Sequence, residues 1–210
     1  MGPGPGLPPV DLVVLAGGRA TRLGGQDKAA LVVGGSTLLE RVLGADLGGR
    51  TVVVGDTPVP ADVTRTTEQP PGGGPVAGIG AGLDALAGMP RPGSPARPLG
   101  PPAWVAVCAV DQPGAARALG ALRETVGSLP EEVEAVCPRV EGRAQWLLAI
   151  YRRAALDAAR ESLPQLHGAS VRSLVSGLRW HEVGLDPADL GDVDTWEDVR
   201  RWRGGARGNS

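Results

Sequence analysis

The sequence is poor in several residue types that most proteins use freely. Its 210 residues include no phenylalanine and one tyrosine, and Lys28 is the only lysine among 21 basic residues. Glycine and proline, with 33 and 20 residues, make up about a quarter of the chain, although the apolar runs described below argue against global disorder. This usage is typical of a bias in coding composition. A single lysine kept against such a bias calls for a functional reason.

An excess of charge of one sign is also absent. The formal net charge is −2 and the isoelectric point is about 5.7, whereas nucleic-acid binding depends on a basic surface. No run approaches the ~18 consecutive apolar residues of a membrane-spanning helix. Residues 1–9 lack the charged start and apolar stretch of a secretory signal. We therefore expect a cytoplasmic protein with no nucleic-acid partner and no membrane contact.

The two cysteines, Cys108 and Cys137, lie in apolar, strand-like runs. Neither belongs to a CxxC motif or has a histidine nearby, as a zinc site would require. The sequence therefore predicts two buried free thiols.

Alternating strand and helix patterns predict the fold class. Short apolar, often β-branched runs predict strands at residues 10–15, 51–54, 103–110, 133–137 and 145–151. Because these runs are apolar at nearly every position, we expect both faces of the sheet to be covered, as in a mostly parallel sheet. Helices are predicted at residues 36–47, 75–87, 114–127, 152–163, 170–177 and 195–203. The prediction is an α/β fold with a single doubly wound, mostly parallel sheet.

The same patterns predict one domain. It extends over residues 10–203 and contains an irregular loop rich in proline and glycine at residues 88–102. Residues 1–9 are expected to form a flexible leader and residues 204–210 a flexible tail.

The segment after the first predicted strand, Leu15 to Lys28, is the most informative in the chain. It reads LAGGRATRLGGQDK and combines four glycines with three cationic side chains. Glycine amides can approach a phosphate closely, and ligands of open α/β sheets bind at the carboxyl ends of the strands. The segment matches neither GxxxxGK[ST] nor GxGxxG, so the ATPase and dinucleotide patterns are disfavoured. We expect it to bind the phosphates of a nucleotide.

LAGGRATRLGGQDKAAL resembles the signature LAGGxSxRMGxDKxxL of the molybdopterin nucleotidyltransferase family. Four later segments resemble motifs of the same family in the same order. GGGPVAGIGAGL (72–83) is similar to GPLAGIxAAL, VDQP (110–113) to DxP, EGRAQWLLAIYRRAAL (141–156) to RxQPLxALY, and DVDTWEDV (192–199) to NxNTPEDL. The resemblance covers roughly residues 11 to 202 and implies a Rossmann-like nucleotidyltransferase fold.

The resemblance implies an activity and its partners. The family's guanylyltransferases transfer GMP from GTP to molybdopterin, forming molybdopterin guanine dinucleotide and pyrophosphate, with Mg²⁺ as cofactor. A cytidylyltransferase, or another nucleotidyltransferase of the same fold, is the alternative enzyme. An inactive nucleotide-binding module that serves a partner protein is the alternative outside enzymes. Contact with molybdoenzymes or with other proteins of cofactor biosynthesis is a further expectation.

The resemblance also implies roles for individual residues. The expected catalytic residues are Lys28 and Arg22, as cations on the phosphates, and Asp111, as the Mg²⁺ ligand. The residues expected to bind the nucleotide are Leu15, Ala16, Gly17, Gly18, Lys28, Glu68, Gly74 and Asp111. From the residues alone, Asp111 could equally form a turn before Pro113. For Asp27 we favour a helix cap over ligand contact.

Two departures from the family pattern concern the acceptor side of the reaction. Gln145-Trp146 stands where the family has Gln-Pro, and Asp192 and Asp194 stand where it has two asparagines. Both aspartates could bind a metal or cap the following helix. For Asp194 we expect the cap.

Overall fold

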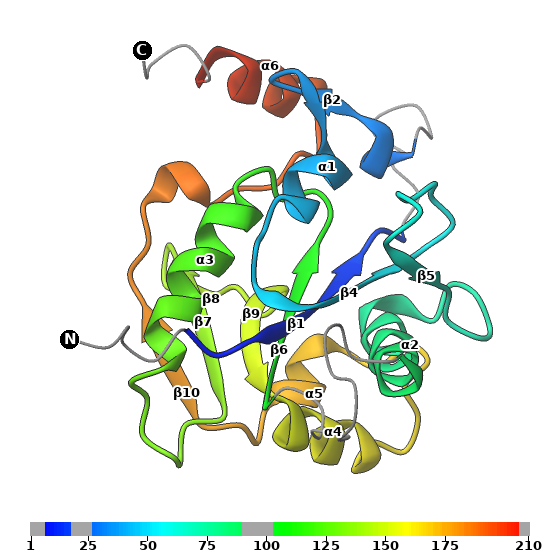
Figure 1. The fold of residues 1–210 in the computed structure, drawn as a ribbon, viewed down its shortest axis with the longest axis vertical. Helices are drawn as coiled ribbons and strands as arrows, with labels where there is room; N and C mark the ends of the chain where they lie inside the picture. Colours follow the sequence, from blue (N-terminus) through cyan, green and yellow to red (C-terminus); the bar gives the residue numbers. More distant parts are fainter. Residues whose placement is uncertain (1–6, 18–26, 90–102, 206–210) are drawn as a thin grey trace.

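The computed structural model of the chain describes residues 7–17, 27–89 and 103–205, and its centre is a β-sheet (Figure 1). Seven strands follow the order β10-β7-β9-β6-β1-β4-β5, and the short strand β8 pairs with β7. The strands are β1 (Val10–Leu15), β4 (Gly48–Val54), β5 (Thr64–Thr66), β6 (Trp104–Ala109), β7 (Ala135–Val140), β8 (Arg143–Ala144), β9 (Leu148–Arg152) and β10 (Trp180–Val183).

Most of this sheet is parallel. β1 pairs in parallel with both β4 and β6, β4 with β5, and β7 with β10. β9 is the exception, because it runs antiparallel to both β6 and β7. The predicted α/β fold with a mostly parallel sheet is therefore confirmed.

In the described residues, six helices cover the two faces of the sheet. Each coincides with a predicted helical segment, although α2 extends one residue beyond it at both ends and α6 two residues beyond it at its C-terminus. One layer holds α1 (Leu38–Leu43), α3 (Ala115–Val126) and α6 (Trp196–Gly205), and the other holds α2 (Gly74–Gly88), α4 (Arg153–Glu161) and α5 (Val171–Val175). β1 shows why the strands are apolar at nearly every position. Val10, Leu12 and Val14 pack into the first layer, whereas Val13 and Leu15 pack into the second. Alternate residues thus face two separate cores.

The start of β4 carries an irregularity against β1. Val10 aligns with Gly48 but Leu12 aligns with Thr51, so β4 has an extra residue there. A Cβ atom on Gly49 would lie 2.2 Å from the carbonyl oxygen of Val10, so only glycine allows this approach.

Some elements were not predicted. They are the edge strands β5 and β10, strand β8, the hairpin of β2 (Val32–Val33) and β3 (Ser36–Thr37), and the 3₁₀ helices η2 (Lys28–Ala30) and η3 (Pro187–Asp189). The strand predicted at residues 145–151 is shorter at its start, because β9 begins at Leu148. The predictions for residues 1–6, 90–102 and 206–210 lie outside the described residues.

The predicted burial of both thiols is confirmed. Cys108 on β6 and Cys137 on β7 are buried and free. Burial raises the pKa of both thiols, to about 11 for Cys137. Among the described residues, no helix combines the length and apolar character needed to span a membrane.

Candidate active site

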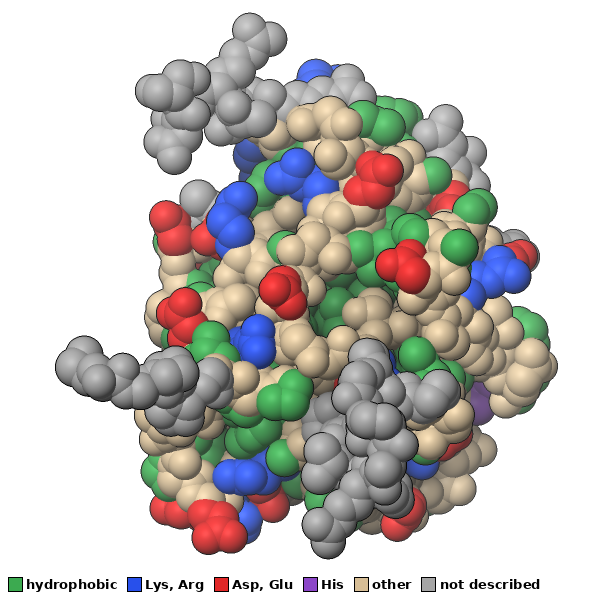
Figure 2. Space-filling model, in the orientation of Figure 1, with side chains coloured by type: hydrophobic (Ala, Val, Ile, Leu, Met, Phe, Trp, Pro, Cys, Tyr) green, Lys and Arg blue, Asp and Glu red, His purple; other side chains and the backbone are tan. Residues whose placement is uncertain are grey.

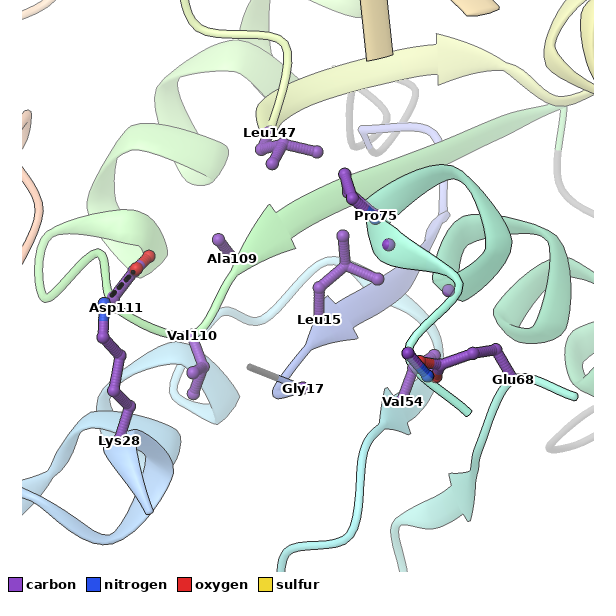
Figure 3. A pocket seen from close by; sticks show the side chains of 13 residues that line it. Leu15, Gly17, Lys28, Val54, Glu68, Pro75, Ala109, Val110, Asp111 and Leu147 are labelled. Atoms are coloured by element: carbon purple, nitrogen blue, oxygen red, sulfur yellow. Dashed lines mark hydrogen bonds and ion pairs between the residues drawn. The ribbon is translucent and has the colours of Figure 1, made fainter. Parts of the chain in front are cut away.

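The carboxyl ends of β1, β4 and β6 open into a pocket of about 500 Å³. Three chain segments that are distant in sequence reach it, because neighbouring parallel strands end at the same edge of the sheet. The lining residues are Leu15, Gly17, Lys28, Val54, Glu68, Gly72, Gly74, Pro75, Gly78, Ala109, Val110, Asp111 and Leu147. Apolar side chains form its middle, and Lys28 with Asp111 lies at the end opposite Glu68 (Figure 3).

Lys28 is the first residue of the short helix η2. Asp27 caps this helix, as predicted, by accepting a hydrogen bond from the amide of Ala29 at 3.0 Å. The ammonium group of Lys28 lies 2.9 Å from Oδ2 of Asp111 and 2.5 Å from Oδ1 of Asp194. Burial by itself would lower the pKa of Lys28, but the hydrogen bonds to Asp194 and Asp111 outweigh it and raise that pKa. Lys28 is therefore a cation shared by two carboxylates.

Asp111 follows the carboxyl end of β6, and the segment 192–194 is tied to it. The backbone carbonyl of Asp111 accepts a hydrogen bond of 2.8 Å from the amide of Val193. Burial and the charge of Asp111 raise the pKa of Asp192, while a hydrogen bond from Gln112 opposes that rise. Three carboxylates, those of Asp111, Asp192 and Asp194, therefore gather around Lys28, and we call these four residues the charge cluster.

The prediction that Asp194 caps the last helix is wrong. Thr195 and Asp198 form the cap of α6 instead: Thr195 Oγ1 accepts from the Asp198 amide at 3.2 Å, and Asp198 Oδ2 accepts from the Thr195 amide at 2.9 Å. Hydrogen bonds from Thr195 accordingly lower the pKa of Asp198. Since this reciprocal box satisfies the helix start, the carboxylate of Asp194 is available to Lys28.

The opposite end of the pocket is built by the segment before α2. Oε1 of Glu68 accepts a hydrogen bond of 3.1 Å from the amide of Gly72, so the carboxylate is fixed against the glycine segment. Gly74 begins α2 and Pro75 occupies its first turn. α2 packs tightly on β1 beneath the pocket, since a Cβ atom on Gly78 would lie 3.1 Å from Leu15.

Most of the predicted site residues meet in this one pocket. Those that line it are Leu15, Gly17, Lys28, Glu68, Gly74 and Asp111. Ala16 lies beside it and is buried, and its amide donates to the carbonyl of Val54 at 2.8 Å. Gly18 and Arg22 lie outside the described residues. The contact of Asp194 with Lys28 was not predicted; its only sequence signal is an aspartate where the resembling motif has asparagine.

A second hollow of about 280 Å³ adjoins the first across Ala109, Asp111 and Leu147. Its other lining residues are Gln112, Gln145, Trp146, Val171 and Asp192. Trp146, at one departure from the family pattern, therefore lies next to the charge cluster, and Asp192, at the other, belongs to it.

The face of the molecule drawn in Figure 2 carries mixed charge. In the described part of the face drawn in Figure 2, acidic and basic side chains are interspersed and form no extended patch of one sign. Within residues 7–17, 27–89 and 103–205, no group of three or more His, Cys, Asp or Glu side chains is arranged around a metal-sized space.

Comparison with known proteins agrees with the geometry. Residues 12–183 match the family model described as the MobA-like NTP transferase domain. The chain is 38% identical over 200 residues to a probable molybdenum cofactor guanylyltransferase of Mycobacterium marinum, covering 89% of this chain and 90% of the relative. It is 27% identical over 186 residues to a protein of the same description from Bacillus cytotoxicus, covering 80% and 85%.

Solved structures share the fold, and two of them illustrate the likeness. Molybdopterin-guanine dinucleotide biosynthesis protein A of Archaeoglobus fulgidus has a TM-score of 0.63 at 20% identity, covering 93% of this chain and 97% of its own. The 2-C-methyl-D-erythritol 4-phosphate cytidylyltransferase of Thermus thermophilus has a TM-score of 0.61 at 19% identity, covering 93% and 98%.

Proposed function

The chain belongs to the family of MobA-like NTP transferase domains and is a nucleotidyltransferase, and from this premise we propose that it transfers GMP from GTP to molybdopterin. The products are molybdopterin guanine dinucleotide and pyrophosphate. The names of the Mycobacterium and Bacillus relatives support this choice of substrates. The observation that carries the proposal is the pocket that holds Lys28 and Asp111 at one end and Glu68 at the other.

The reaction needs positioned charge rather than a covalent nucleophile. The terminal phosphate of molybdopterin attacks the α-phosphorus of GTP, and the bond from that phosphorus to the bridging oxygen of pyrophosphate breaks. Negative charge develops on the α-phosphate and on the leaving group, and preorganised cations stabilise it. Lys28 takes this role, with Arg22 as the proposed second cation. Leu15, Ala16, Gly17, Gly18 and Gly74 supply the backbone and side-chain surface on which the nucleotide rests.

Two carboxylates of the charge cluster, those of Asp111 and Asp194, support the choice of a divalent cation as cofactor. Asp111 and Asp194 already point oxygens at one shared cation, the ammonium of Lys28, and Mg²⁺ favours one or two carboxylates together with substrate phosphates. We assign Asp111 as the Mg²⁺ ligand, with Asp194 beside it. When bound, Mg²⁺ neutralises phosphate charge. The ammonium of Lys28 is then free to leave the carboxylates for the nucleotide.

Glu68 suits the base end of the nucleotide. Guanine presents N–H groups on its Watson–Crick edge, and an ionised carboxylate is an acceptor only. Because the amide of Gly72 holds one oxygen of Glu68 in place, the carboxylate is oriented before the base arrives. We assign Glu68 to guanine on this ground.

Transfer of CMP is the second candidate. The fold is shared with the Thermus cytidylyltransferase almost as closely as with the Archaeoglobus protein, and a phosphate site recognises charge rather than base. The intact pair of Lys28 and Asp111 disfavours an inactive binding module.

A direct assay separates these candidates. The purified protein is incubated with molybdopterin, Mg²⁺ and GTP, CTP or ATP in turn, and the dinucleotide product is identified by mass. We expect product with GTP, and a larger rise in thermal midpoint with Mg²⁺-GTP than with the other two. An Asp111→Asn variant is the matched control and should form little product. A cytosine dinucleotide as main product, or equal thermal shifts for all three nucleotides, contradicts the guanine assignment.

A further inference from the structure

A buried threonine that follows β4, Thr57, forms a hydrogen bond with Asp27, the residue before Lys28. Thr57, three residues beyond the end of β4, donates from its hydroxyl to Oδ2 of Asp27 at 2.6 Å. We infer that Thr57 is a positioning residue, which acts through Asp27 to fix the direction of Lys28 toward the nucleotide phosphates. The inference rests on the proposed function in one respect, namely that Lys28 acts on those phosphates.

Asp27 uses its two carboxylate oxygens for two different partners. Oδ1 accepts from the amide of Ala29 and so caps η2, while Oδ2 accepts from Thr57. The helix η2 has only three residues, so few backbone bonds hold it by themselves. The bond to Thr57 therefore joins the start of this short helix to the segment that follows β4.

Thr57 is itself firmly held. Its residue exposure is 2%, and its carbonyl oxygen lies 3.5 Å from a guanidinium nitrogen of Arg65 on β5. Two residues earlier, a Cβ atom on Gly55 would lie 2.8 Å from the carbonyl carbon of Ala16. The segment of Thr57 thus packs directly against the start of the phosphate-binding segment. It is a buried support for Asp27.

The position of the Lys28 backbone matters because its ammonium must change partners. In the structure the ammonium lies between Asp111 and Asp194. To contact a phosphate it must leave at least one of these carboxylates, and the contacts at its tip then constrain the side chain less. The constraint at its base, where Asp27 and Thr57 hold η2, stays unchanged. The hydroxyl of Thr57 therefore matters for Lys28, although the two residues are distant in the sequence.

The sole lysine makes the inference directly measurable. Growth on lysine labelled with ¹³C at Cε gives one side-chain signal, that of Lys28, in the full-length protein without any substrate. We compare wild type with Thr57→Val, which removes the hydroxyl at similar volume, and with Thr57→Ser, which keeps it. Thr125→Val is the matched control, because it also removes a threonine hydroxyl bond, to Ala121 at 3.2 Å, but in α3.

We expect Thr57→Val to move the Lys28 signal and to lower kcat by roughly 10- to 100-fold, the range caused by misplacing a catalytic group by about 1 Å. KM for the nucleotide should change much less. Thr57→Ser should restore both readouts, and Thr125→Val should match wild type. A folded Thr57→Val protein with the wild-type Lys28 signal overturns the inference, as does a kcat loss that serine does not rescue.

Two cases need a separate reading: a Thr57→Val protein that does not fold, and a wild-type protein that makes no dinucleotide. If Thr57→Val does not fold by circular dichroism, Asp27→Asn tests the same link, since it weakens the bond to Thr57 but keeps a capping oxygen; an unmoved Lys28 signal there contradicts the inference. If wild type makes no dinucleotide at all, the proposed function fails. The Lys28 signal, recorded without substrate, still decides whether Thr57 positions that side chain.

Discussion

Replacing Lys28 by alanine separates its contribution to stability from its contribution to turnover. The side chain of Lys28 is 19% exposed, and its partners Asp111 and Asp194 are 23% and 51% exposed. Solvent therefore reaches all three groups, most of all Asp194. The substitution leaves two carboxylates without their shared cation and removes the charge that we assign to the phosphates.

The expected loss of stability is small. Ion pairs of exposed groups stabilise a protein by about 0–1 kcal/mol, and the pair with Asp194 belongs to that class. The less exposed pair with Asp111 contributes more, but water can solvate Asp111 once Lys28 is gone. We expect a total loss of about 1 kcal/mol, which lowers the Tm of a chain of this size by roughly 2–4 °C.

The expected loss of turnover is much larger. Removing one preorganised group that stabilises developing charge lowers kcat by about 10²–10³-fold, or about 3–4 kcal/mol. Lys28→Arg keeps the charge but replaces a compact ammonium by a planar guanidinium, so we expect it to recover only part of the activity. Thermal melts by circular dichroism and dinucleotide formation by mass measure the two effects. A folded Lys28→Ala protein with near-normal kcat, or one that fails to fold, refutes this reasoning.

Two other predictions concern the sheet and the charge cluster. Gly49→Ala forces a Cβ atom to within 2.2 Å of the Val10 carbonyl and should destabilise the fold by about 1–3 kcal/mol in urea titrations; an unchanged midpoint would contradict the close approach. Burial and the charge of Asp111 raise the pKa of Asp192, so the folded state favours the protonated acid and loses stability as pH rises through that pKa. Asp192→Asn should therefore raise the Tm at pH 7 and have little effect near pH 3, below the unfolded pKa of about 3.9; the opposite pH trend would be evidence against the shift.

The sequence predicts the strands at the centre of the sheet, which have a neighbouring strand on each side and a helix layer on each face. β1 is buried at all six positions and is apolar at every position except Asp11, which gives a run that the sequence pattern detects. The edge strands β5 and β10 gave no such signal. β5 is the three-residue segment TRT, and β10 contains the exposed His181 and Glu182. Each pairs with a neighbouring strand on one edge only. The pairing in the folded protein, rather than the residue pattern, therefore makes it a strand.

The site could be predicted where residues follow a strand or belong to a motif. Lys28 and Asp111 come after β1 and β6, which are neighbouring parallel strands and therefore end at the same edge of the sheet. The partner of Asp194 could not be predicted in the same way. Both Asp194 and Thr195 are good helix caps by residue type, and only the three-dimensional contact with Lys28, 166 residues away, decides between them. Thr57 belongs to no motif and is recognised only by what it touches.

The charge cluster also explains how aspartates at positions 192 and 194 alter the site. With its three carboxylates ionised, one ammonium and three carboxylates leave the cluster with a net charge of −2. Asparagines at both positions, as in the resembling motif, would leave Lys28 and Asp111 to neutralise each other. A nucleoside triphosphate is itself a polyanion, so a cluster of charge −2 repels the free nucleotide, whereas a divalent cation offsets that charge and attracts the phosphates. In the proposed reaction, Asp192 and Asp194 thus make nucleotide binding at this site more dependent on Mg²⁺ than a pair of asparagines would.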